Sequence, residues 1–346
     1  MKNFILFSLM GLSFCSFSQI KEPHLKNLKQ LTHGGDNAEA YFSPNGKFVS
    51  FQSNYVKWGL HCDQIFAMDL KKAAKDSTYR PPLISTGKGR TTCSYYMPDG
   101  KHILFGSTHT ASDSCPPVAY MKGKYLWDIY PDYDIFISDL NGKITKQLTN
   151  TPGYDAEATI SPKGDKIVFT SDRSGDMELW TMEIDGSNQK QITFGLGYDG
   201  GAFFSPNGKK LVFRASRPQT EAEITEYKDF FKRHLVAPTN MEIYTCNVDG
   251  SDLKQVTNLG KANWAPYFLP SGDKIIFSSN HNSDKGYDFN LFVINVDGTG
   301  LTQITSESKF NAFPMFSPNG KKLIFSSNRN NGGTRDTNLF IADWVD

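Results

Sequence analysis

Polar and aromatic residues gather in five short segments, each directly before a stretch rich in β-forming residues. The segments hold Asp36 and Glu39; Tyr154, Asp155 and Glu157; Tyr198 and Asp199; Asn263 and Trp264; and Asn311. Carboxylate and amide oxygens suit hard cations, so carboxylates from three segments could hold a calcium ion or a cationic group of a ligand. The same side chains could equally cap neighbouring loops through hydrogen bonds to the backbone. The chemistry therefore depends on whether the fold gathers these segments.

A repeated turn positions the segments. Pro and Gly two residues apart recur six times, at Pro44–Gly46, Pro98–Gly100, Pro162–Gly164, Pro206–Gly208, Pro270–Gly272 and Pro318–Gly320. Ser-Pro-Asn-Gly suits a type I turn whose last residue needs a positive φ. Because β-prone residues flank each copy, each turn predicts the tip of a β-hairpin.

Two further strands follow each hairpin. Third strands are predicted at 64–69, 134–139, 178–183, 242–247, 290–295 and 338–343, and short fourth strands follow five of them, for example Gln191-Ile192-Thr193. A four-stranded sheet cannot bury both faces alone, but six arranged radially can. We therefore predict an all-β fold, a six-bladed β-propeller of four-stranded antiparallel blades. The sixth fourth strand is missing, and Gln30-Leu31-Thr32 near the N-terminus is predicted to replace it and close the ring.

The repeats, with their Ser-Pro-Asn-Gly turn and preceding Gln-Leu-Thr, resemble those of TolB-like six-bladed propellers, over residues 28–344. The resemblance implies a periplasmic scaffold that binds other proteins. TolB itself carries an additional N-terminal α/β domain, for which this sequence leaves no room. Similar propellers also precede the catalytic domains of prolyl-oligopeptidase-type peptidases, but no nucleophile-elbow pattern follows here.

Strand alternation places the loops before the first strand and after the second strand of each blade on one face, the loop face. Two loops there are long: residues 107–133 are rich in Tyr and Trp, and residues 215–240 contain an expected amphipathic helix over 221–235. The helix could be a lid or a partner-binding element, or it could merely cover its own blades. Function is expected on this face rather than at the tight turns.

One position four residues beyond the second-strand Phe differs between repeats. It holds Tyr55, His109, Arg173, Arg217, His281 and Arg329. The arginines are most simply structural, although Arg173 is kept as a candidate ligand-binding residue. His109 and His281 suggest a metal, but they fall on opposite blades, so each would need other ligands such as His33 or His61. No Ser-His-Asp arrangement carries a local signature, and no catalytic residue is predicted.

The N-terminus predicts export. Lys2, the apolar run from Phe4 to Phe14, and Ser16 and Ser18 form a signal peptide over residues 1–18, leaving residues 19–346 as one propeller domain in the periplasm or outside the cell. Disulfides are then permitted. We favour Cys93–Cys115, with Cys62–Cys93 as the rival, and expect Cys246 to be a buried thiol.

The composition and net charge restrict the classes of partner that this protein is expected to bind. The net charge is +1, and no basic run or later apolar span occurs, so we expect no nucleic-acid partner, no membrane span and a monomer. The first hypothesis is a non-catalytic scaffold that binds an envelope or secreted protein, a small ligand or a glycan. The alternatives are a hydrolase or polysaccharide lyase with a polar or metal site in the central funnel, and an accessory propeller of a separate peptidase.

Overall fold

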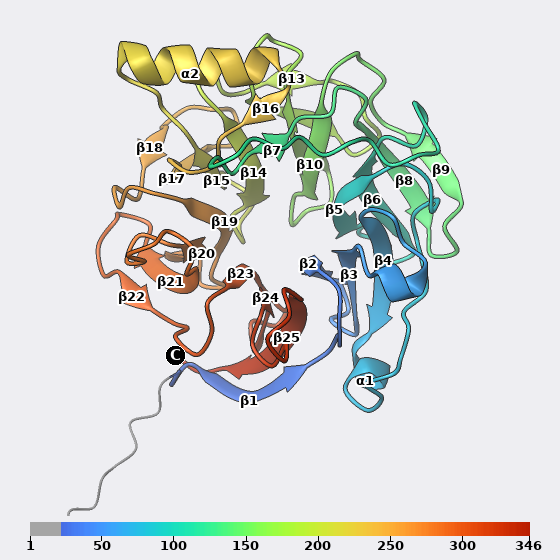
Figure 1. The fold of residues 1–346 in the computed structure, drawn as a ribbon. Helices are drawn as coiled ribbons and strands as arrows, with labels where there is room; N and C mark the ends of the chain where they lie inside the picture. The colour runs from blue at the N-terminus through green and yellow to red at the C-terminus, as the bar shows by residue number, and fades with distance from the viewer. Residues whose placement is uncertain (1–21) are drawn as a thin grey trace, which may run out of the picture.

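Six antiparallel sheets surround a central channel in the computed structural model, which describes residues 22–346 (Figure 1). This arrangement confirms the predicted six-bladed propeller. The predicted signal peptide lies outside the described residues. Within the described part of the chain, no helix is long and apolar enough to cross a membrane.

Each blade runs from an inner strand at the channel to an outer strand at the rim. Blade one contains β2 (Asn37–Phe42), β3 (Phe48–Ser53) and β4 (Gln64–Asp69); blade two contains β5 (Thr91–Tyr96), β6 (His102–Ser107), β8 (Asp134–Asp139) and β9 (Ile144–Gln147); blade three contains β10 (Asp155–Ile160), β11 (Lys166–Ser171), β12 (Glu178–Glu183) and β13 (Lys190–Gln191). Blade four contains β14 (Asp199–Phe204), β15 (Lys210–Ala215), β17 (Glu242–Asn247) and β18 (Lys254–Gln255); blade five contains β19 (Asn263–Phe268), β20 (Lys274–Ser279), β21 (Asn290–Asn295) and β22 (Thr302–Gln303). Blade six contains β23 (Asn311–Phe316), β24 (Lys322–Ser327), β25 (Asn338–Trp344) and β1 (Leu25–Gln30). In blade one, a single bridge from Leu83 to Phe66 stands at the place of the fourth strand.

The Pro-Gly turns form as their composition predicts. In blade four, the Gly208 amide donates to the Ser205 carbonyl at 2.8 Å, and Gly208 has a φ of +69°. The Ser205 hydroxyl accepts a hydrogen bond at 2.9 Å from the backbone amide of Lys210, the first residue of β15. Local chemistry therefore sets the hairpin register in each blade.

A β-bulge interrupts every inner strand at the same place. In blade three, for example, the pairing of β10 with β11 shifts register between Ala156 and Thr159. The third residue of each inner strand has a positive φ, from +47° to +60°, and we call these six positions the ring residues: Glu39, Cys93, Glu157, Gly201, Ala265 and Phe313. All six border one narrow space on the channel axis. A bulge re-aims a side chain, and here it brings one residue from each blade to the axis.

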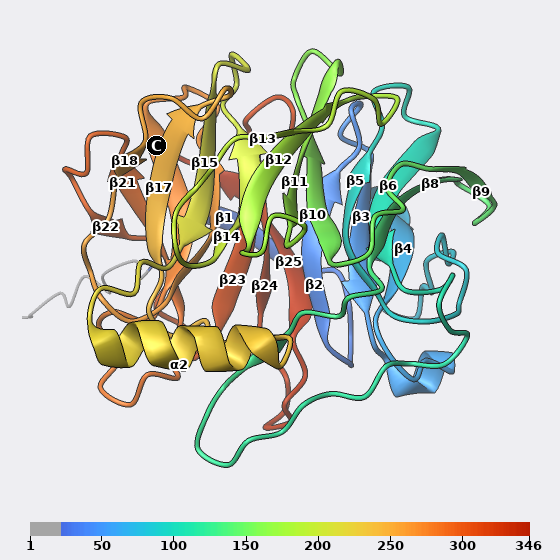
Figure 2. The ribbon, with the colours of Figure 1, turned by 90° about the horizontal axis from the view of Figure 1, so that it is seen from above.

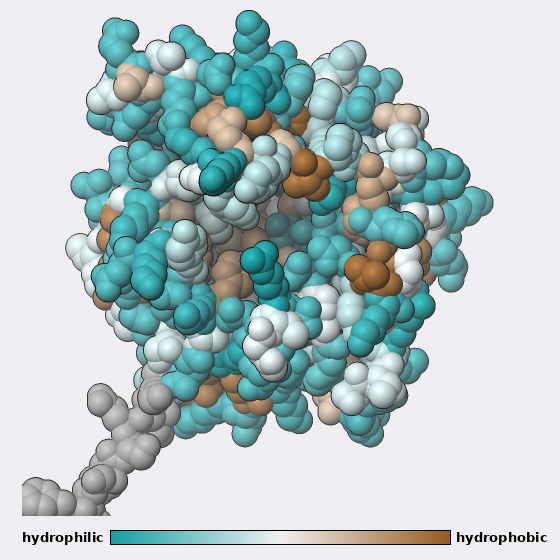
Figure 3. Space-filling model, viewed as in Figure 1, coloured by the Kyte–Doolittle hydropathy of each residue, from teal (hydrophilic) through white to brown (hydrophobic). Residues whose placement is uncertain are grey.

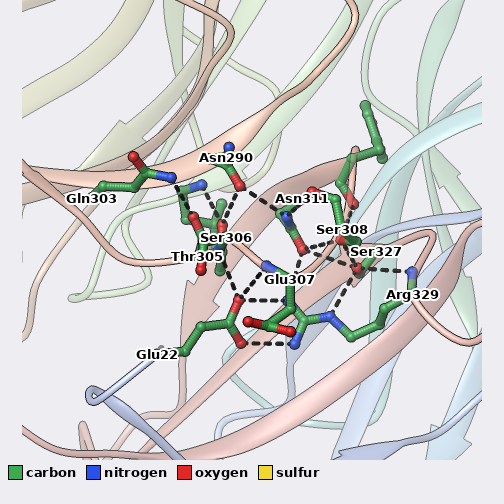
Figure 4. A network of polar contacts seen from close by, with 12 residues as sticks. Glu22, Asn290, Gln303, Thr305, Ser306, Glu307, Ser308, Asn311, Ser327 and Arg329 are labelled. Carbon is green, nitrogen blue, oxygen red and sulfur yellow. Dashed lines mark hydrogen bonds and ion pairs between the residues drawn. The ribbon is translucent and has the colours of Figure 1, made fainter. Parts of the chain in front are cut away.

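The N-terminal segment is attached to the sixth blade. Strand β1 pairs with β25 in an antiparallel register, and the Leu31 amide donates to the Leu339 carbonyl at 2.8 Å. Ahead of β1, the buried Glu22 carboxylate binds the Arg329 guanidinium at 2.9 and 3.1 Å (Figure 4). It also accepts from the amides of Ser306 and Glu307, in the loop between blades five and six. The contribution of this attachment to the stability of the ring stays a prediction.

Two insertions meet over the loop face. The 107–133 insertion carries β7 (Trp127–Asp128), which pairs with β16 (Leu235–Val236) of the 215–240 insertion. The second insertion also contains α2 (Glu221–Lys232), which begins at a capping box formed by Thr220 and Glu223. Figure 2 shows α2 and the first insertion on the same face of the ring. Two short helices, η1 (Val56–Trp58) and α1 (Leu70–Ala73), lie in blade one.

The predicted Cys93–Cys115 disulfide is wrong, and so is its rival Cys62–Cys93. The disulfide joins Cys62 to Cys115 with 6.0 Å between their Cα atoms, and it ties the first insertion to the loop after β3. Cys93 is a free buried thiol because it is a ring residue, and the bulge turns its side chain toward the channel and away from the loops. Cys246 is also free and buried, as predicted.

Replacing Glu22 by Ala is expected to lower the free energy of unfolding by about 3 kcal/mol, because it leaves the buried Arg329 guanidinium unpaired. Chemical denaturation followed by tryptophan fluorescence measures this change. Lys26→Ala, an exposed substitution on β1, is the control and is expected to have little effect. Equal stability of the two variants would show that the N-terminal attachment does not stabilise the ring.

Mass spectrometry of unreduced protein is expected to recover a peptide linking Cys62 to Cys115. Cys93 and Cys246 are expected to react with an alkylating reagent only after unfolding, because both thiols are buried. A linked peptide that contains Cys93 would refute this assignment.

Candidate functional site

A cavity of about 320 Å³ opens at the centre of the loop face. The space-filling view of this face is hollowed at its centre (Figure 3). Five of the residues singled out from the sequence line the cavity: Glu39, Tyr154, Glu157, Tyr198 and Trp264. They come from blades one, three, four and five, so the propeller brings together segments that lie far apart in the sequence.

The other six candidates lie outside this cavity. They are Asp36, Asp155, Arg173, Asp199, Asn263 and Asn311. Asp36 is exposed in the loop before β2. The remaining five take part in a bonding pattern that recurs at the loop-face ends of the blades.

That pattern joins the first residue of an inner strand to the end of the second strand. Asp155 forms an ion pair with Arg173 at 2.5 Å, and Asp199 pairs with Arg217 in the same way. In blade five, the Asn263 side chain accepts from the Ser279 hydroxyl at 2.6 Å. Asn311 accepts in the same way from Ser327 at 2.9 Å. These side chains therefore hold the ends of blades together and are engaged by the protein itself.

Histidines at the equivalent position have a similar environment. His109 lies against the Phe136 ring and bonds to Ser107 at 2.8 Å. His281 lies against Phe292 and bonds to Ser279 at 3.0 Å. Burial lowers the pKa of both imidazoles, which favours the neutral form in these contacts.

The donor set does not suit the calcium ion suggested by the sequence. Asp155 and Asp199 are held by arginines, and Glu157 is paired with a third arginine, Arg214. Within residues 22–346, no three His, Cys, Asp or Glu side chains are grouped so that they could hold a metal ion.

The floor of the cavity is a buried ion pair between blades three and four. The Arg214 guanidinium bonds to Glu157 and donates to the Tyr198 hydroxyl at 2.8 Å. The Glu157 carboxylate also accepts from Tyr198 at 2.6 Å, from Thr170 at 2.8 Å and from the Gly201 amide at 2.9 Å. A buried carboxylate with this many donors is fully satisfied as a charged group.

Gly201 makes room for this ion pair. It is the glycine among the ring residues, and a Cβ atom there would lie 2.0 Å from an Arg214 nitrogen. The guanidinium instead stacks between two aromatic rings, 4.9 Å from the Trp127 centroid and 5.3 Å from that of Tyr198. In blade four, the Arg214 side chain of the second strand therefore fills the space that a side chain at the ring position would take.

Glu39 is the second carboxylate among the ring residues, and its surroundings are different. It accepts a long hydrogen bond of 3.4 Å from Tyr41 and a bond from the Cys93 thiol. Burial raises the pKa of Glu39, and the neighbouring Glu157 carboxylate raises it further, although the Arg214 charge and the two hydrogen bonds partly oppose this shift. Burial likewise raises the pKa of the Cys93 thiol, with help from both carboxylates, so Cys93 is a thiol and not a thiolate at neutral pH.

Aromatic residues of the first insertion form the wall of the cavity. The Trp127 ring lies 5.2 Å from that of Trp264, which stacks on Phe289 at 4.3 Å. On the opposite side, Arg90 pairs with Asp63 at 2.5 Å and lies over the Tyr130 ring at 5.7 Å. The insertion thus adds an aromatic wall to a polar floor.

The channel does not continue openly to the turn face. Below the ring residues, the rings of Tyr41, Phe203 and Tyr267 are in contact, with centroids 5.7 and 5.2 Å apart. Tyr95 joins the same group through Tyr41 at 5.7 Å. These aromatic side chains belong to the fifth positions of their inner strands and close the channel, so the loop-face cavity is a blind funnel.

Sequence reasoning missed Arg214, Arg90 and Asp63. Arg214 was detectable, because the equivalent position of the aligned second strands holds uncharged residues such as Thr170 and Ser278. The ring residues are a second aligned position at which the residue type varies between otherwise similar repeats. Arg90 and Asp63 lie in loops without a repeat pattern, and no local signal marks them.

Substitutions of the two ring carboxylates are expected to change stability in opposite directions. Glu157→Ala should lower the free energy of unfolding by about 3 kcal/mol, because it leaves Arg214 buried and unpaired. Glu39→Gln should raise the melting temperature at neutral pH. Because its pKa is raised, Glu39 keeps its proton to a higher pH in the folded protein than in the unfolded protein. The free energy of unfolding of the wild type therefore falls as the pH rises from the usual pKa of 4.5 through the raised pKa of folded Glu39.

Melting curves of both variants from pH 4 to pH 8 test this contrast. The advantage of Glu39→Gln should shrink as the pH falls toward 4.5, where the wild-type carboxyl is also neutral. A Glu39→Gln variant less stable than wild type at every pH would contradict the assignment of Glu39 as an uncompensated carboxylate.

Comparison with solved structures supports the architecture. A TolB-like protein from Agrobacterium tumefaciens aligns with a TM-score of 0.57 at 19% identity, covering 90% of this chain and 91% of that one. TolB from Acinetobacter baumannii aligns with a TM-score of 0.55 at 17% identity, covering 89% of this chain and 63% of that one. An oligogalacturonate lyase from Vibrio parahaemolyticus gives 0.53 at 12% identity, with coverage of 91% and 93%. At these identities the similarity shows the fold alone.

A family model provides the assignment. The model described as the TolB beta propeller domain matches residues 130–236 and 231–335, which together make up more than half of the 346 residues. The matched ranges include the two outer strands of blade two, blades three to five, and the two inner strands of blade six. This chain therefore belongs to the TolB beta-propeller domain family.

Proposed function

We propose that this protein is an exported, non-catalytic propeller that binds a segment of another envelope or secreted protein at its loop face. The observation that carries this proposal is the blind funnel, which the first insertion lines and which the second insertion flanks by pairing with the first through β7 and β16. Its volume of about 320 Å³ lies at the lower end of the range for ligand pockets, so it suits one or two side chains of a larger partner.

The surface around the funnel supports a protein partner. Three side chains of the first insertion are strongly exposed: Val118 at 65%, Tyr120 at 88% and Tyr125 at 58%. Tyrosine is enriched at protein interfaces, where it combines apolar area with a hydrogen-bonding group. Val118 and Tyr125 also line the cavity, so a partner seated on the rim would reach the funnel.

The chemistry of the floor supports binding rather than catalysis. Glu157 and Asp63 are held in ion pairs with Arg214 and Arg90, and neither is free to act as a base. Burial beside carboxylates keeps Cys93 protonated, which disfavours nucleophilic attack.

Export agrees with the covalent structure. The Cys62–Cys115 disulfide links two loops of the funnel side, and such bonds persist in oxidising compartments. We accordingly place the protein in the periplasm or outside the cell, where the predicted signal peptide would deliver it.

Site-specific photo-crosslinking in the source cells tests this function. A benzophenone amino acid placed at Tyr120 is expected to form an adduct with a partner protein. The same group at Asn207, exposed on the turn face, is the matched control and is expected to form none. Adducts from Asn207 alone, or from neither position, would overturn the proposed binding face.

A further inference from the structure

The carboxylates that line the funnel are not equally compensated. They are Glu39, Asp63, Asp128 and Glu157, and the two arginines of the same lining are Arg90 and Arg214. The arginines are already engaged, Arg90 with Asp63 and Arg214 with Glu157. Asp128 accepts from the Ala119 backbone amide at 3.0 Å. With four carboxylates against two guanidinium groups, the funnel favours a cation, and its low-dielectric walls strengthen that preference.

Within residues 22–346, Glu39 and Asp128 are the two lining carboxylates without an ion-pair partner, and of these two it is Glu39 that lies at the channel axis. Among the described residues, no Lys, Arg or His forms an ion pair with it, and its hydrogen bonds come from the neutral Tyr41 hydroxyl and Cys93 thiol. Its side chain is half-buried and borders the open cavity. The bulge, with a φ of +54° at a residue that is not glycine, holds the carboxylate in this place.

The aromatic walls of the funnel are also suited to a cationic group. The cavity is lined by the rings of Tyr125, Trp127, Tyr130, Tyr133, Tyr154, Tyr198, Trp264, Phe310 and Phe313. Aromatic faces attract ammonium and guanidinium groups. Two guanidinium groups of the protein already form such contacts, since Arg214 lies over the Trp127 ring and Arg90 lies over the Tyr130 ring.

We propose that the funnel receives a lysine or arginine side chain of the partner protein, with Glu39 as its counter-ion. This inference rests on the proposed function and specifies the chemistry of the partner. A polypeptide suits the site better than a free amine, because the exposed Val118, Tyr120 and Tyr125 on the rim could pack against the residues that flank the cationic side chain.

Isothermal titration of the mature protein with N-acetyl-arginine amide tests the inference. N-acetyl-citrulline amide has nearly the same shape without the charge, and it is expected to bind at least about tenfold more weakly, as is expected for the loss of one charge-assisted hydrogen bond. Glu39→Gln should weaken the arginine compound by a similar factor. Asp36→Asn, which removes an exposed carboxylate in the loop before β2, should bind it like wild type.

Melting curves of both variants are measured first, to check that they are folded. The inference is overturned if citrulline and arginine compounds bind alike, if neither binds, or if Glu39→Gln leaves the affinity unchanged. Its failure is distinct from failure of the proposed function. Adducts at Tyr120 without arginine binding would reject the cationic side chain alone, whereas arginine binding without adducts at Tyr120 would reject the protein partner.

Discussion

The bulge in the inner strand of every blade is the constraint on which the funnel depends. In a regular strand, successive side chains alternate between the two faces of the sheet. The extra residue of the bulge breaks that alternation and turns one side chain per blade toward the axis. Six blades thus contribute six ring residues to a space that no single blade could enclose. Because the backbone conformation is the same in all six, the chemistry of the axis is set by which side chain occupies each position.

The ring residues also show how a propeller combines stability with a polar interior. Glu157 is stabilised by Arg214, Tyr198 and a backbone amide, and Gly201 leaves the space that Arg214 fills. Glu39 has weak hydrogen bonds and a raised pKa, so it is held at a cost to folding. Groups retained at such a cost are concentrated at functional sites, where the binding partner supplies what the fold does not.

The insertions surround the mouth of the channel with aromatic side chains and connect three blades. Strands β7 and β16 come from blades two and four, and their pairing spans blade three. The disulfide from Cys115 to Cys62 anchors the same insertion on blade one. These links hold the aromatic wall in place relative to the floor, so the proposed partner would bind to a site that is already ordered. Loops on a rigid scaffold are where binding sites are commonly found, and here the scaffold and the loops share residues.

The sequence alone determined the architecture, because the evidence for it is local. Turns such as Ser205-Pro206-Asn207-Gly208 and the strands beside them encode hairpins through contacts between near neighbours, and six copies leave few alternatives to a ring. It also located the loop segments that surround the axis, and five of eleven candidate residues line the cavity. Only the tertiary structure decided which side chains reach it. Asp155 and Glu157 are two residues apart, yet one is tied to Arg173 and the other reaches the axis, because a bulge separates them. The disulfide partner of Cys115, the pairing of the insertions and the position of Arg214 depend on contacts between distant segments, which residue types and spacing do not specify.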